Sequence, residues 1–220
     1  MAVKFFISRE GETEQWYFEW LQREINSDVR AKNKIEFKFK NVMPSSFSKS
    51  NASMFTKEML NGAYFCRVQD IEDYQSERLQ KFEALLKSNK EAKKIFPKFN
   101  FSIGYSNYTF EVWMIAHRAN VRAEVDRKNY YKQINGAYGK SFQDNDDYKH
   151  ERNFKSLLDM LTLDDVINNA IPRCEQMRRS NIVSYPHLKR SAYNFDYFLN
   201  NPDTSLHEFV KQILLTAGII

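Results

Sequence analysis

Short apolar runs separated by amphipathic stretches occupy the first half of the chain. Residues 3–8 (VKFFIS) and 63–68 (AYFCRV) are apolar and rich in aromatic and β-branched side chains, which predicts two buried strands. Residues 34–42 alternate between apolar and polar positions, the pattern of a half-exposed strand. Residues 99–107 predict a further strand. The chain therefore has several candidate strands before its midpoint.

Helices are predicted between these strands. Apolar residues recur at helical spacing over residues 12–25 and 76–88, which predicts two amphipathic helices. A short helix is also predicted ahead of the second buried strand, with Ser50 or Asn51 as its candidate N-cap. Residues 109–117 are apolar enough for either a helix or a strand. The alternation of strands with helices favours an α/β fold with a largely parallel sheet flanked by helices.

The second half of the chain has a different pattern of apolar and polar residues from the first half. The sequence therefore predicts three parts. Residues 1–118 form the predicted α/β core. Residues 119–190 are rich in polar residues and predict a mostly helical insertion or appendage, interrupted at Pro172. Residues 191–220 end in an amphipathic helix that is expected to pack back on the core.

Composition narrows the class of protein. Hydrophobic residues make up 42% of the 220 residues, enough for a sizeable core, and no apolar run approaches the length of a membrane span. The N-terminus turns polar too early for a secretory signal, and Cys66 and Cys174 are too few for a disulfide framework or a complete zinc site. We therefore expect a cytoplasmic protein without membrane association. The formal net charge of +5 permits nucleic-acid binding and is equally compatible with an ordinary solvated surface.

Acidic residues follow two of the predicted strands. Glu10 and Glu14 come after the first strand, and Asp70 and Glu72 come after the strand that contains Cys66. Because ligands of α/β sheets gather at the carboxyl ends of strands, these carboxylates predict a site for Mg²⁺ or Mn²⁺. The alternative is that these acids only cap helices and favour the positive end of the helix dipole.

Four blocks of sequence carry a resemblance to a known family. They are EGETEQWYF at 10–18, FCRVQDIEDY at 65–74, SNYTFEVWMIAH at 106–117 and NPDTSLHEFVKQIL at 201–214. In order and spacing the blocks resemble the RloB-like proteins, which belong to the wider toprim group of topoisomerases, primases and nucleases of overcoming-lysogenization-defect systems. The resemblance implies a toprim-like core with a central, mainly parallel four-stranded sheet between helices.

The resemblance also implies roles for individual residues. Glu10 matches a first-strand glutamate that acts as a metal ligand or general acid/base, and Asp70 and Glu72 match the acidic pair that holds the divalent cation. Glu14 matches a second acidic position of the nuclease branch, and Glu111 matches a glutamate that faces the same site. The sequence departs from the family pattern at Glu72, where an aspartate is usual.

Two further departures from the family pattern occur near these blocks, together with a candidate histidine. Tyr74 stands where a histidine is frequent, and Tyr108 stands where a proline is frequent. His117 ends the third block and is a candidate supporting residue that faces the site, with a structural role in the core as the alternative.

Basic residues in the second half of the chain are candidates for nucleic-acid contacts. Such residues form two groups, one on a predicted helix face and one near His187, and they are Arg173, Arg178, Arg179, Lys189 and Arg190. Their alternative role is that of ordinary surface charges.

These observations lead to a functional hypothesis with two alternatives. The main hypothesis is a Mg²⁺- or Mn²⁺-dependent nuclease with catalytic residues Glu10, Asp70 and Glu72 that acts on DNA or RNA, with tRNA among the candidate substrates. The resemblance implies a role in antiviral defence or abortive infection with an ATPase partner. One alternative is a non-catalytic regulatory or interaction subunit with a relic toprim site, and the other is a nucleotidyl transferase or primase-like activity. The chain contains no P-loop motif of its own.

Overall fold

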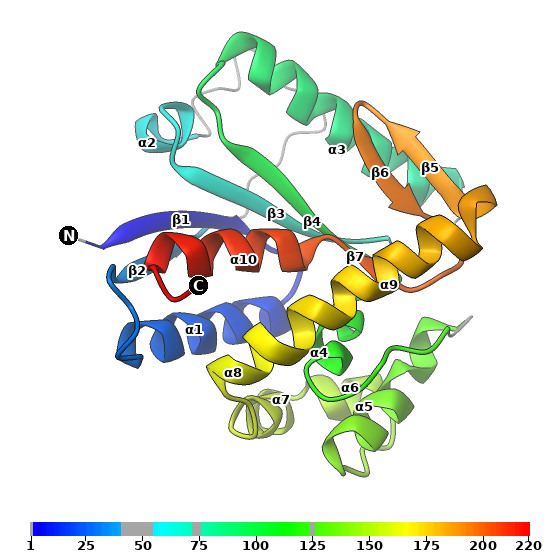
Figure 1. Cartoon of the computed structure of the whole chain (residues 1–220). Helices are drawn as coiled ribbons and strands as arrows, with labels where there is room; N and C mark the ends of the chain where they lie inside the picture. Colours follow the sequence, from blue (N-terminus) through cyan, green and yellow to red (C-terminus); the bar gives the residue numbers. More distant parts are fainter. Residues whose placement is uncertain (1, 41–54, 72–75, 124–125) are drawn as a thin grey trace.

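The computed structural model describes residues 2–40, 55–71, 76–123 and 126–220, which build a central sheet with helices on both faces (Figure 1). The strands of this sheet within the described residues are β1 (Val3–Ser8), β2 (Ile35–Phe39), β3 (Tyr64–Ile71), β4 (Phe101–Asn107) and β7 (Asp203–Thr204). Their order is β2-β1-β3-β4-β7; β1 to β4 are parallel and β7 is antiparallel to β4. The predicted α/β class with a mostly parallel sheet is confirmed.

The strand register determines which loop residues meet at the edge of the sheet. Ser8 at the end of β1 lies opposite Arg67 of β3, so Glu10 follows β1 at the level of Gln69 and Asp70. Strand β3 continues three residues past the predicted end at Val68, because its backbone keeps pairing with β4 up to Ile71. Asp70 is therefore part of the strand and not of the loop after it.

Two hydrophobic layers cover the two faces of the sheet. Side chains alternate along β1, so Phe5 and Ile7 enter one layer and Phe6 enters the other. The first layer lies under α1 (Glu12–Ser27), α4 (Glu111–Ala116) and α10 (Leu206–Ala217). The second lies under α2 (Lys57–Leu60) and α3 (Ser76–Ile95), together with a hairpin of β5 (Lys189–Ala192) and β6 (Phe195–Phe198) (Figure 1). The region predicted at 109–117 is thus a helix.

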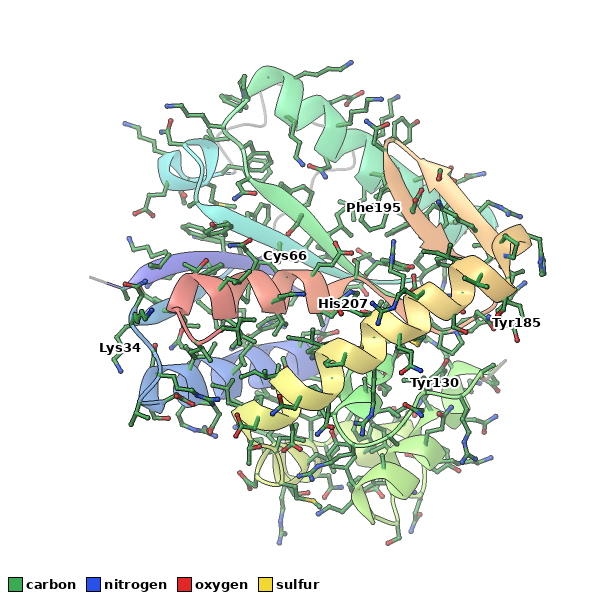
Figure 2. All side chains as sticks on the ribbon, viewed as in Figure 1. Lys34, Cys66, Tyr130, Tyr185, Phe195 and His207 are labelled. Carbon is green, nitrogen blue, oxygen red and sulfur yellow. The ribbon has the colours of Figure 1, made fainter. Side chains whose placement is uncertain are left out.

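Helix α10 approaches the sheet closely at a glycine. A Cβ atom at Gly104 of β4 would lie 2.8 Å from Cδ1 of Leu206 and 3.3 Å from Sγ of Cys66, so only glycine fits without a shift. Gly218 ends the helix in the left-handed conformation with φ +74°, as expected of a helix C-cap. The predicted packing of the C-terminal helix on the core is observed, and Figure 2 shows Cys66 in the sheet beside this helix.

Residues 119–190 are mostly helical, as predicted. Their elements are η2 (Arg127–Asn129), α5 (Tyr130–Tyr138), α6 (Asn145–Lys149), α7 (Glu151–Leu158), α8 (Leu163–Asp165), the π-helical turn η3 (Val166–Ala170), α9 (Ile171–Ser184) and η4 (Pro186–Leu188). Pro172 does not break the helix. It lies in the first turn of α9, where its missing N–H is tolerated, and the π-helical turn precedes it.

Other predicted details need correction. The short helix α2 is capped by Thr56, whose hydroxyl accepts a hydrogen bond from the Met59 amide at 3.2 Å; the predicted caps Ser50 and Asn51 lie outside the described residues. Helix α3 runs to Ile95, beyond the predicted end at residue 88. In the described part of the chain, no helix is long and apolar enough to cross a membrane.

Candidate functional site

The carboxyl ends of β1 and β3 bring Glu10 and Asp70 into direct contact. The backbone N–H of Asp70 donates a hydrogen bond of 3.0 Å to Oε2 of Glu10. The Gln69 side-chain amide donates to the other oxygen, Oε1, and Arg67 lies 3.5 Å from the same atom. Glu10 keeps 31% of its side chain exposed, so it lies at the mouth of the site.

Arg67 and Gln69 were not among the predicted site residues, although one signal for them was present. Arg67 is a charged residue inside an otherwise apolar strand, and its guanidinium also donates to the Ser8 hydroxyl and the Arg9 carbonyl, both at 2.9 Å. These bonds tie the end of β1 to β3. Arg67 also forms an ion pair with Glu10, whereas the Arg9 guanidinium donates to the Gly11 carbonyl at 3.0 Å.

The Oδ1 atom of Asp70 is buried and has no hydrogen-bond partner among the described residues. Oε1 of Glu111 also lacks a hydrogen-bond partner there, but it lies 2.9 Å from the ammonium of Lys149. Burial, followed by the charges of Glu10, Glu14 and Glu111, raises the pKa of Asp70 well above its ordinary value, and Lys149 opposes this shift. A buried carboxylate oxygen without a donor is an open position for a cation or a proton.

Glu14 performs the capping role that the sequence left as an alternative, and it also belongs to the acidic site. Its Oε2 accepts a 3.0 Å hydrogen bond from the Gly11 N–H at the start of α1, and its side chain is almost fully buried. Burial raises its pKa, and the charges of Glu10 and Glu111 add to the shift. The two interpretations of this residue are therefore compatible.

Glu111 reaches the same site from the first turn of α4. Its carboxylate is buried, accepts a hydrogen bond from the Thr109 hydroxyl, and lies 2.9 Å from the ammonium of Lys149. Burial alone would lower the pKa of Lys149, but Glu111, Asp70 and Glu14 outweigh it and raise that pKa. Lys149 comes from α6 in the insertion, and nothing in the sequence pattern indicated that it would reach the acids.

The described acidic side chains lie in one site, but they are not arranged as a complete set of metal ligands. Each of three acids already has a partner in the protein. Glu10 accepts a hydrogen bond from the Asp70 N–H of β3, Glu14 caps α1, and Glu111 forms an ion pair with Lys149. Within residues 2–40, 55–71, 76–123 and 126–220, no group of three or more His, Cys, Asp or Glu side chains is arranged to hold a metal ion. The predicted ligand Glu72 and the neighbouring Tyr74 lie outside the described residues. The free oxygen of Asp70 nevertheless fits a hard cation.

A cavity opens beside the acidic pair. It has a volume of about 310 Å³, and its lining includes Glu10, Gln69 and Asp70 on the sheet side and Arg78, Lys81 and Phe82 of α3 on the other. Arg78 and Lys81 are exposed on the first turns of that helix. The acidic pair is therefore open to solvent through a cavity with a basic wall.

His117 is placed in the core. It is fully buried, its Nε2 lies 3.2 Å from the Tyr17 hydroxyl, and its Nδ1 lies 2.9 Å from the Trp113 carbonyl. Burial lowers its pKa to about 4, so the ring is neutral at pH 7. This placement corresponds to the structural alternative for His117, and its ring is held by core residues and not by the acids.

The predicted basic residues are mostly engaged within the fold. Arg173 donates to the Ala116 carbonyl at 2.8 Å, and Arg178 pairs with the buried carboxylate of Asp203 at 2.9 Å. Lys189 pairs with Asp196 at 2.7 Å across the hairpin. Arg179 and Arg190 are exposed, and Arg190 donates to the backbone carbonyls of its own turn.

Comparison with known proteins supports one family assignment. A protein-family profile described as RloB-like protein matches residues 5–213, which is nearly the whole chain. No curated protein and no solved structure gives a significant match. The match includes the insertion as well as the strands that carry the acids, and the chain therefore belongs to the RloB-like protein family.

Proposed function

We propose that this RloB-like protein is a divalent-metal-dependent nuclease with a toprim-like core that cleaves phosphodiester bonds of DNA or RNA. The observation that carries the proposal is the buried Oδ1 of Asp70, which has no donor among the described residues and lies among the charges of Glu10, Glu14 and Glu111. Such an arrangement costs stability unless a cation completes it. Its position at the carboxyl end of a parallel strand is where α/β enzymes bind ligands.

The donor set fits Mg²⁺ or Mn²⁺, because carboxylate oxygens are the ligands that these hard cations prefer. Asp70 and Glu10 would hold the ion, with Glu14 nearby and Glu72 as the next acid along the chain. The bound ion would supply Lewis-acid stabilisation of the charge that develops on the phosphoryl oxygens.

Glu10 is the residue best suited to proton transfer. Its carboxylate is partly exposed at the cavity, while the Gln69 amide and the Asp70 N–H fix its orientation. In this position it would accept a proton from an attacking water or return one to the leaving oxygen.

The cavity beside the acids suits a phosphodiester substrate. Arg78 and Lys81 on its α3 wall would contact the non-bridging oxygens of the backbone, while Glu10 and Asp70 face the scissile bond from the sheet side. Contacts of this kind recognise the backbone without reading the base sequence. Contacts of this kind therefore do not distinguish DNA from RNA, including tRNA, as the substrate.

The family assignment adds a biological setting to this proposal. The resemblance to RloB-like proteins of phage-defence and abortive-infection loci suggests that the nuclease acts in defence and that a partner ATPase restrains or triggers it. This chain has no P-loop motif, so a separate protein would carry the nucleotide-dependent step.

The test is cleavage of labelled DNA and RNA by the purified protein, alone and with a partner ATPase, in Mg²⁺ or Mn²⁺. Asp70→Ala should lower metal-dependent cleavage by on the order of 100-fold or more, the scale of losing a group that stabilises transition-state charge. Asp159→Ala is the matched control, because Asp159 is an exposed acid at the end of α7. Equal cleavage by the wild type and Asp70→Ala would exclude this site as the nuclease centre.

A second candidate function is a non-catalytic regulatory or interaction subunit with a relic site. The pairing of Lys149 with Glu111 favours it, because a lysine within an acidic site neutralises charge without a metal ion. Calorimetric titration with Mn²⁺ separates the two candidates. Binding by the wild type that is lost in Glu10→Ala supports the nuclease, whereas no binding at millimolar Mn²⁺ supports the relic.

A further inference from the structure

Lys149 connects the helical insertion with the acidic site. It is the last residue of α6, its ammonium lies 2.9 Å from Oε1 of Glu111, and 42% of its side chain remains exposed. The Glu111 side chain is only 2% exposed. The pair therefore joins a buried carboxylate to a side chain that enters from the surface.

The position of Lys149 is fixed by the residues around it. Asp144 caps α6 by accepting a 2.8 Å hydrogen bond from the Asp147 N–H, and the adjacent Tyr148 is fully buried. The Asn153 amide donates to the Asp147 backbone carbonyl at 2.8 Å, which ties α6 to α7. These contacts fix the backbone of α6 at the point from which the Lys149 side chain extends to Glu111.

The six described charged residues named for this site include more acids than bases. Glu10, Glu14, Asp70 and Glu111 carry four negative charges when ionised, and Arg67 and Lys149 carry two positive charges. The difference is 4 − 2 = 2 negative charges. Arg67 lies 3.5 Å from Glu10 and Lys149 lies 2.9 Å from Glu111, while Oδ1 of Asp70 has no hydrogen-bond partner among the described residues.

We propose that Lys149 is a built-in cation of this site that takes the place of a second metal ion, so that the chain binds one divalent ion, at Asp70 and Glu10. This inference rests on the proposed metal-dependent function and adds the number of ions and the role of the insertion. A second ion beside Glu111 would meet the ammonium at close range, and two like charges in a partly buried site repel strongly.

The test is the stoichiometry of Mn²⁺ binding, measured by calorimetry and by the loss of the free Mn²⁺ paramagnetic resonance signal. The wild type should bind one ion per chain, and Asp70→Ala should bind none. Lys149→Gln should bind two, because removal of the ammonium frees the carboxylate of Glu111. Lys149→Arg keeps the charge and should still bind one.

Lys155→Gln is the matched control, since Lys155 lies on the neighbouring helix α7 and pairs with an exposed acid, Glu151. It should bind one ion, like the wild type. Lys149→Met serves as a second neutral variant if Lys149→Gln does not fold, as judged by circular dichroism.

The outcomes separate this inference from the proposed function. Two ions in the wild type, or one ion in the wild type and in every folded neutral Lys149 variant, overturn the role of Lys149 and leave a metal-dependent nuclease standing. No Mn²⁺ binding by the wild type overturns both. The wild-type measurement alone can overturn the inference, so it does not depend on the folding of any variant.

Discussion

Asp70 is held in a position that opposes its own ionisation. Its Oδ1 is buried without a donor among the described residues, and burial together with the neighbouring acids raises its pKa. In the metal-free protein the ionised form is therefore destabilising, whereas its neutral form is tolerated. A carboxyl group that destabilises the metal-free fold in this way is typical of a ligand-binding site.

Replacing Asp70 by asparagine should therefore stabilise the metal-free protein at pH 8. Asparagine keeps the shape and removes the charge, and the expected gain in the free energy of unfolding is on the order of 1–2 kcal/mol. Because the raised pKa belongs to the folded state, the folded protein binds more protons than the unfolded one, and wild-type stability falls as pH rises above about 4. The gain should thus vanish near pH 4.

Urea denaturation at pH 8 and pH 4, with chelator present, measures this difference. The same variant should lose Mn²⁺-dependent cleavage, which links the stability cost to the function. A variant less stable than the wild type at pH 8 would show that Asp70 is satisfied in the metal-free protein.

The residues of the site differ in how far the sequence predicts them. Glu10 and Asp70 were predictable because parallel strands end at one edge of the sheet, and each acid follows or ends a recognisable apolar strand. The position of Lys149 was not predictable, because its contact with Glu111 joins two helices through tertiary packing. The sequence pattern of neither helix specifies which residue of the other it contacts. Gln69 is a similar case, because its side-chain bond to Glu10 depends on the register of β1 and β3.

Helix α9 shows how a basic segment can be structural. Arg178 was predicted to belong to a nucleic-acid track, but its guanidinium pairs with the fully buried Asp203 of β7 and donates to the Asp196 carbonyl of β6 at 2.8 Å. It therefore fastens α9 to the edge of the sheet and to the hairpin. The adjacent Arg179 is exposed. Sequence spacing placed both on a helix but did not specify which residue faces the core.

Substitution of these two arginines should separate the structural role from a surface role. Arg178→Met removes the cationic partner of the buried Asp203 carboxylate, which keeps the hydrogen bond from the Tyr105 hydroxyl. The substitution should lower the free energy of unfolding by about 3 kcal/mol, as for other broken buried pairs. Arg179→Met, on the exposed side, should change it by less than about 0.5 kcal/mol. Chemical denaturation at pH 7 measures both. Equal effects of the two substitutions would contradict the assignment of Arg178 to the fold.

At the scale of the whole molecule, the insertion is part of the core. Tyr130, Ile134 and Phe154 of the insertion are buried in the same hydrophobic layer as Tyr17 and Leu21 of α1, so no break in packing follows residue 118. Figure 2 shows Tyr130 within the helical region below the sheet. The polar composition of residues 119–190 predicted helices correctly. It did not reveal this shared layer, because short helices with few apolar positions do not specify what they pack against.

At the scale of the whole molecule, basic side chains of α3 lie beside the acidic site. The acids lie at the edge of the sheet, and the cavity beside them has Arg78 and Lys81 on its outer wall. Lys81 is exposed and pairs with an exposed acid of its own helix, Glu77, at 2.8 Å, a contact that contributes little to stability in solution. Arg78 and Lys81 are therefore placed to contact a polyanion that binds in this cavity.

Lys81→Met should weaken the binding of a short fluorescein-labelled oligonucleotide without affecting the fold. One lost phosphate contact should make the plot of log affinity against log salt less steep by about one unit. Lys94→Met is the control, because Lys94 is an exposed lysine in the last turn of the same helix, far along α3 from the cavity. Fluorescence anisotropy over a range of NaCl concentrations, in Ca²⁺ to suppress cleavage, measures both slopes. A lower slope in both variants would mean that the oligonucleotide binds along α3 as a whole, and an unchanged slope in Lys81→Met would exclude the cavity as the binding site.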